Sequence, residues 1–163
     1  MYHRVLVALE HSAYDAAIVA HVRELARCCH SSVVLIHVAD GWAARNLRHL
    51  DLRESEEMRD DRAYLEHVGA ELREGGLDVD AILANGDPSR EIAAAAEREG
   101  CDLIAMATHG HGFINDVVRG SVANEVRHRT TVPVLLVRGT KPNGQPAVAR
   151  DAGTQSQQRP PSP

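Results

Sequence analysis

The chain of 163 residues is long enough for one domain and a tail, and its apolar content of 44% and charged content of 25% are typical of soluble globular proteins. Every cation is an arginine except Lys141, which precedes a proline, so the sequence excludes a P-loop and offers no plausible Schiff-base lysine. No apolar run approaches the roughly 18 residues of a membrane span. Met1–Glu10 is too short and too charged for a signal peptide.

Five of the seven prolines fall within residues 139–163, which predicts a disordered Pro/Gln/Ser-rich tail after a domain at residues 1–138. The net charge of −5 divides into +2 on the tail and −7 on the domain. A net acidic domain is a poor partner for nucleic acid. The cysteines, Cys28, Cys29 and Cys101, show no metal or redox spacing, so we expect small buried side chains and a reducing, cytoplasmic compartment.

Apolar runs of strand length alternate with helical periodicity along the first 138 residues. A capping box at Ser12 and Asp15, a C-cap at Gly75-Gly76 and an N-cap at Asp87-Pro88 predict helix ends. Helices are expected after Ser12, Ser55, Asp87 and Gly120, and residues 40–53 are expected to be irregular or partly helical. The expected strands are Arg4–Leu9, Ser32–Val38, Val79–Ala84, Asp102–Ala107 and Val132–Val137.

This order of elements predicts an α/β fold with a parallel sheet covered on both faces. Ligands of such sheets bind at the carboxyl ends of the strands, where the strand order reverses. The loop after the fourth strand, from Ala107 to Ser121, places three glycines and a serine around a helix start. Free amides at that start favour a phosphate, although a C-cap, a turn and an N-cap without any ligand fit the same residues.

That loop resembles the nucleotide-binding loop of the universal stress protein family. ATP-binding members show Gly, two residues, Gly, nine residues and Gly-Ser/Thr, and this chain shows Ala107, Gly110 and Gly120-Ser121 at the same spacing. The resemblance extends in order over residues 1–138. It includes VLVALEHS (5–12), LIHV (35–38), GDP (86–88), DLIAMATHG (102–110) and TTVPVLLVR (130–138). The chain is identified as a member of the ATP-binding type.

The resemblance implies a three-layer Rossmann-like (adenine nucleotide α-hydrolase-like) fold with strand order 3-2-1-4-5, and a homodimer through the last strand, residues 132–137. It implies ATP as ligand, with Mg²⁺ as a candidate ion. Two residues depart from the family pattern: Ala107 replaces the first glycine, and Glu10 replaces an aspartate. Alanine at 107 is expected to cost little if that residue still lies on the strand.

The family's site residues map onto matching positions of this chain. Ala8, Leu9 and Glu10 would line the ribose and adenine side, and the backbone of Val38 would meet adenine. Met106, Ala107 and Gly110 would flank the ribose and α-phosphate. His111, Gly112, Gly120, Ser121 and Val122 would surround the phosphates. Arg119 is either a further phosphate partner or a solvated cation.

Other polar clusters favour simpler interpretations. His109 and His111 lack a third ligand, so no metal site is assigned. His37 is expected to be a hydrogen-bonded wall residue rather than a base, and the acidic run 54–61 a solvated helix face rather than a docking surface.

The favoured function is an ATP-binding regulatory protein whose nucleotide occupancy biases a dimer or an unidentified protein partner. The alternatives are a nucleotide-free dimeric adaptor and an adenine-nucleotide hydrolase that uses His111 or Glu10. No catalytic residue is assigned, and any ATP hydrolysis is expected to be slow.

Overall fold

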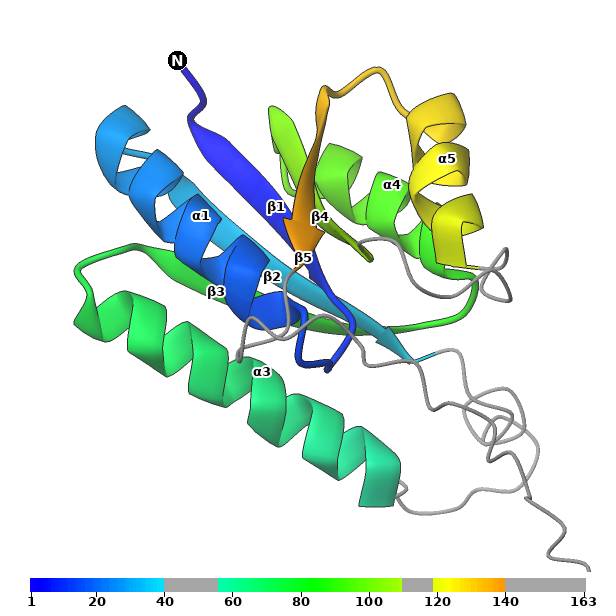
Figure 1. The fold of residues 1–163 in the computed structure, drawn as a ribbon, viewed down its shortest axis with the longest axis horizontal. Helices are drawn as coiled ribbons and strands as arrows, with labels where there is room; N and C mark the ends of the chain where they lie inside the picture. The colour runs from blue at the N-terminus through cyan, green and yellow to red at the C-terminus, as the bar shows by residue number, and fades with distance from the viewer. Residues whose placement is uncertain (40–55, 110–118, 140–163) are drawn as a thin grey trace, which may run out of the picture.

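The computed structural model describes residues 1–39, 56–109 and 119–139, and Figure 1 shows a sheet with helices against both faces. The sheet is parallel throughout and has the order β3-β2-β1-β4-β5, which confirms the expected fold. Its strands are β1 (Arg4–Leu9), β2 (Ser32–Ala39), β3 (Val79–Asn85), β4 (Leu103–His109) and β5 (Val134–Gly139). The described helices are α1 (Asp15–Cys29), α3 (Glu56–Glu74), α4 (Pro88–Arg98) and α5 (Arg119–Arg129).

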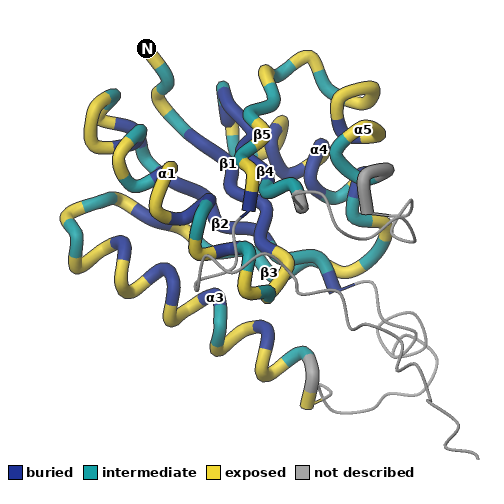
Figure 2. Tube along the Cα trace, in the orientation of Figure 1, coloured by how far each residue is buried: buried dark blue, intermediate teal, exposed yellow. Residues whose placement is uncertain are grey.

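The central strands carry apolar side chains on both faces because helices cover both faces. Along β1, Val5, Val7 and Leu9 pack into the core cluster that includes residues of α1 and α3. Leu6 and Ala8 point the other way, into the cluster that includes residues of α4 and α5. Figure 2 shows the resulting pattern, in which the central strands are buried and the outer helix surfaces are exposed.

Short-range signals set the helix ends largely as expected. Asp87 caps α4 by accepting from the Arg90 amide at 2.9 Å, and Pro88 occupies the first helical position, where its missing N–H costs nothing. Beyond α3, Gly76 has φ +86°, a conformation that other residues adopt only with strain. The capping box at Ser12 is only half formed. The Asp15 carboxylate accepts from the Ser12 amide, while Ser12 Oγ accepts from the Tyr14 amide.

The last strand begins later than the sequence predicts, at Val134 instead of Val132. The Val132 amide is bonded to Thr130 Oγ1 at 3.0 Å, and Pro133 has no amide to donate. Pairing with β4 continues through Gly139, which lies opposite His109. The edge strand therefore covers 134–139 rather than 132–137.

The cysteine prediction is right for Cys101 and wrong for Cys28. Cys101 is buried, and burial raises the pKa of its thiol to about 11. Cys28 is exposed and Cys29 half-buried, because Ala26 rather than either cysteine occupies the buried side of the last turn of α1. No helix in the described part of the chain is long and apolar enough to cross a membrane.

Candidate functional site

The strand order reverses between β1 and β4, so the predicted site lies at the carboxyl ends of these strands. The chain passes from β1 to β2 on one side of β1, whereas β4 pairs with β1 on its other side. The register sets Ala8 opposite Met106 and Leu9 opposite His37. Residues from three separate stretches of sequence therefore meet at one edge, as open α/β sheets require for ligand binding.

The structure divides the apolar residues predicted for the site between the two faces of the sheet. Ala8, Val38, Met106 and Val122 join the cluster under α4 and α5. Leu9 and Ala107 pack on the opposite side, toward α1 and α3. Ala8 and Met106 are buried. A ligand at this edge would therefore meet these strands mainly through their terminal backbone groups.

Ala107 lies within β4 and pairs with Val137 in regular register. Among the described non-glycine residues, positive φ occurs at His11 and His30 and not at Ala107. The backbone at this position therefore does not require glycine. Ala107 therefore meets the condition, a place on the strand, under which alanine is expected to cost little.

Gly120 and Ser121 lie in the first turn of α5, which begins at Arg119. The first amides of a helix have no partner within it, and the helix dipole favours negative charge there. No acidic residue stands in the first turn of α5 to oppose an anion. Gly110, His111 and Gly112, which complete the predicted phosphate loop, lie outside the described residues.

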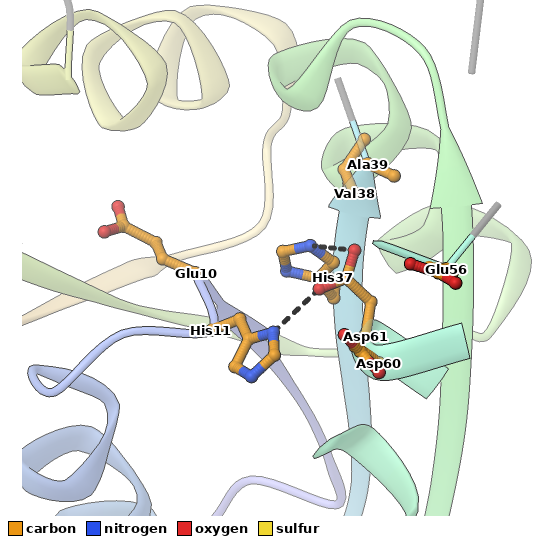
Figure 3. Close-up of a pocket in the computed structure, with 8 residues that line it drawn as sticks. All are labelled: Glu10, His11, His37, Val38, Ala39, Glu56, Asp60 and Asp61. Carbon is orange, nitrogen blue, oxygen red and sulfur yellow. Dashed lines mark hydrogen bonds and ion pairs between the residues drawn. The ribbon is translucent and has the colours of Figure 1, made fainter. Parts of the chain in front are cut away.

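A pocket of about 580 Å³ opens at the carboxyl ends of β1 and β2, beside the start of α3 (Figure 3). This volume is within the usual range for small-molecule sites. Two predicted residues, Glu10 and Val38, are part of its wall, and Figure 3 shows the Glu10 carboxylate turned away from the cluster around Asp61. The described lining residues are Glu10, His11, His37, Val38, Ala39, Glu56, Asp60 and Asp61.

The acidic run 54–61 is not uniformly a solvated helix face, because Asp61 is buried with only 6% of its surface exposed. Its carboxylate lies 2.8 Å from His11 Nδ1 and 3.3 Å from His37 Nε2 (Figure 3). His37 also places Nδ1 2.9 Å from the Leu9 carbonyl, which confirms it as a hydrogen-bonded wall residue. Asp61 thus ties α3 to the ends of β1 and β2.

A second buried carboxylate holds the connection between β1 and α1. Asp15 accepts from the Glu10 and Ser12 amides at 3.2 and 3.1 Å, and from the Tyr64 hydroxyl at 2.8 Å. The Tyr64 ring stacks on His11 with centroids 4.2 Å apart. Burial, followed by the charge of Asp15, raises the pKa of Tyr64 far above its usual range, so its hydroxyl remains a donor.

Sequence reasoning missed His11, Asp15, Asp61 and Tyr64 as parts of this site. One signal was present, since His11 follows one predicted strand and His37 lies near the carboxyl end of the strand that neighbours it in the sheet. The position of Asp61 within an acidic run concealed that it faces inward. Three residues later, Tyr64 lies on the same side of α3, as helical spacing requires.

Comparisons with known proteins agree with the fold. Residues 1–138 match the sequence model of the Universal stress protein family. Universal stress protein MJ0577 of Methanocaldococcus jannaschii is 27% identical over 158 residues, which cover 85% of this chain and 96% of that protein. The solved structure of MJ0577 superposes with a TM-score of 0.69 and covers 86% of this chain and 98% of its own.

Two further solved structures carry nucleotides. A universal stress protein from Archaeoglobus fulgidus in complex with dAMP has a TM-score of 0.61 at 19% identity, covering 83% of this chain and 98% of its own. A universal stress protein in complex with cAMP has a TM-score of 0.62 at 18% identity, and the match covers 83% of this chain and 96% of that protein. With the family match across residues 1–138 and the shared sheet order, this chain belongs to the universal stress protein family.

Proposed function

We propose that this chain binds ATP, with Mg²⁺ as its counter-ion, at the carboxyl ends of β1 and β4, and that nucleotide occupancy biases a homodimer or a partner surface. The observation that carries the proposal is the position of the two described ends of the phosphate loop. One end is Ala107 on a regular strand, and the other is Gly120-Ser121 in the first turn of α5. Ala107 lies on β4, whose pairing with β1 marks the point where the strand order reverses.

The adenosine part of the ligand is assigned to the side of β1 and β2. Glu10 and Val38 belong to the pocket wall there, and a carboxylate is a natural acceptor for ribose hydroxyl groups. The dAMP and cAMP complexes of proteins with this fold make adenine nucleotides the first ligand class to test. The longer side chain of Glu10, compared with the aspartate of the family pattern, keeps the charge and moves it outward by one methylene.

The phosphates are assigned to the start of α5. The first-turn amides at Gly120 and Ser121 are available as donors, and the described helix has no carboxylate in that turn. Mg²⁺ would bind chiefly through the phosphate oxygens, and we assign it no protein ligand. We assign no residue to catalysis and expect hydrolysis to be slow.

The β5 edge supports the proposed homodimer. β5 is the outer strand of the sheet, and Leu136 on it is 42% exposed. An exposed apolar edge strand pairs readily with another chain, and pairing with a second copy would cover it. The variant Leu136→Arg is expected to shift the protein from dimer to monomer in light scattering coupled to gel filtration. A wild-type protein that is already monomeric at the same concentration would remove this part of the proposal.

A nucleotide-free adaptor is the second candidate, and the charge of the pocket favours it. Four of the described lining residues are acidic: Glu10, Glu56, Asp60 and Asp61. Carboxylates oppose the approach of an anionic ligand unless its phosphates are held elsewhere. The two candidates therefore differ in one measurable property, the affinity for adenine nucleotides.

Calorimetric titration with ATP separates the two functions. Wild-type protein should bind ATP, whereas Gly120→Val should lose binding because a side chain there would occupy phosphate space. Asn124→Val is the matched control, since Asn124 is exposed one turn further along α5 and receives the same β-branched side chain. Equal affinities in all three proteins would refute the assignment of the phosphate site. No binding by nucleotide-free wild type would favour the adaptor.

A further inference from the structure

The Asp61 carboxylate is compensated by histidines from two other parts of the fold. A buried charge is costly unless it is paired and hydrogen-bonded. His11, which follows β1, provides Nδ1 at 2.8 Å to one oxygen, and His37 on β2 provides Nε2 at 3.3 Å to the other. Both contacts join α3 to segments that end at the pocket.

The hydrogen-bonding groups fix the orientation of both rings. A carbonyl can only accept, so His37 Nδ1 carries a proton and donates to the Leu9 carbonyl. His37 Nε2 faces the second Asp61 oxygen at 3.3 Å, within ion-pair distance. His11 donates from Nδ1 to the remaining oxygen. One carboxylate therefore contacts two imidazoles, and removing it would leave His37 with its bond to the Leu9 carbonyl and His11 with its stacking on Tyr64.

The same contacts hold the backbone of residues 10–12. His11 has φ +56°, a left-handed conformation that is unfavourable for a non-glycine residue. Asp61 bonds to its ring from one side, and Tyr64 stacks on that ring. Tyr64 in turn donates to Asp15, which accepts the amides of Glu10 and Ser12. The direction of Glu10 from this loop is therefore determined by α3 and α1 together.

We propose that Asp61 is a positioning residue for the adenosine half of the nucleotide site. Through His11 it sets the loop that carries Glu10, and through His37 it holds the end of β2 that carries Val38. Both assigned adenosine contacts depend on this one side chain. The inference rests on the proposed function, and it adds that recognition of the nucleoside is controlled from α3, a helix that carries none of the family's motif residues.

The role of Asp61 predicts a distinctive pattern of affinities. Asp61→Ala should raise the dissociation constants of AMP and ATP by the same factor of at least about ten, which corresponds to ~1.4 kcal/mol. The ratio of the two affinities should not change, because the phosphates are held at the start of α5. Gly120→Val should instead weaken ATP more than AMP. General destabilisation would also weaken both ligands equally, so the comparison is made on Asp61→Ala protein shown by its thermal unfolding curve to be fully folded at the titration temperature.

The conservative variant provides a rescue. Asn in place of Asp61 retains a carbonyl that accepts from His11 and presents an amide that donates to a neutral His37. Asp61→Asn should therefore bind AMP and ATP with affinities within about threefold of those of the wild type. If Asp61→Ala fails to fold, Asp61→Asn should still fold. Glu66→Ala is the control, since Glu66 is an exposed carboxylate on the same helix away from the pocket.

The experiment is calorimetric titration of the full chain and these variants with AMP and with ATP. Amide hydrogen exchange at Glu10 and Ser12, without nucleotide, serves as a second measurement. Two results in Asp61→Ala would support the role of Asp61: faster amide exchange at Glu10 and Ser12, and an equal loss of affinity for AMP and ATP. Asp61→Asn should restore both affinities. Unchanged affinities in Asp61→Ala, or losses in Asp61→Asn as large as those in Asp61→Ala, would overturn it. Wild-type protein that binds neither ligand would overturn the proposed function itself.

Discussion

The substitution Asp15→Ala tests the account of the loop between β1 and α1 most severely. Asp15 is 1% exposed and accepts from two amides and from the Tyr64 hydroxyl, at distances of 2.8–3.2 Å. Each donor that loses its partner in a buried site costs about 1–3 kcal/mol. Because the loop lies near the surface and water can reach part of it, we expect a total loss of about 3 kcal/mol.

For a protein of this size, each kcal/mol corresponds to about 2–4 °C, so Asp15→Ala should lower the Tm by roughly 6–12 °C in calorimetry. The matched control is Asp78→Ala, which removes an exposed carboxylate and should change stability by less than about 0.5 kcal/mol. Equal Tm values for the two variants would refute the claim that Asp15 holds the loop.

Three further predictions concern other parts of the fold. Gly139→Ala should lower the free energy of unfolding in urea by about 1–3 kcal/mol, because the new Cβ would lie 2.8 Å from Tyr14 Cβ. The control Gly69→Ala should be neutral or stabilising, since its new Cβ meets only the flexible Arg73 guanidinium. Equal effects of the two variants would contradict this packing. Hydrogen bonds from Ser89 and the Arg90 amide lower the pKa of Asp87, so its stabilisation is present above pH ~4 and lost at lower pH. Asp87→Ala should therefore cost about 1 kcal/mol at pH 7 and less in acid, and a cost that grows in acid would contradict it. Cys28 should react with a thiol reagent at pH 8 in the folded protein, and Cys101, whose thiol pKa is raised to about 11, only after unfolding.

The fold was predictable because short-range and long-range requirements agree over most of the chain. The strands from Arg4 to Leu9 and from Ser32 onward are apolar enough to be buried on both faces, and the Asp87-Pro88 pair marks a helix start without help from tertiary contacts. The start of β5 was misplaced because Val132 looks like a strand residue. Its amide is instead used by Thr130, just before pairing with β4 begins.

The site was only partly predictable, since its polar side chains meet through the tertiary fold. Ala8, Glu10, Val38 and Met106 lie at the expected edge of the sheet. The inward position of Asp61 was hidden because its neighbours Asp60 and Arg62 are exposed, and the periodicity of a polar helix is weak. The positive φ of His11 has no signature in the sequence. It depends on Asp61 and Tyr64, which are about fifty residues away.

Thermal unfolding of nucleotide-free protein, with and without millimolar MgATP and with MgGTP as control, is the decisive measurement for the proposed adenine site. A ligand that binds only the native state at 100 times its Kd stabilises that state by about 2.7 kcal/mol, which is a rise in Tm of about 5–10 °C here. We expect such a rise in Tm with ATP and little or none with GTP. An unchanged Tm with both nucleotides, or equal rises with both, would contradict an adenine-specific site at the ends of β1 and β4.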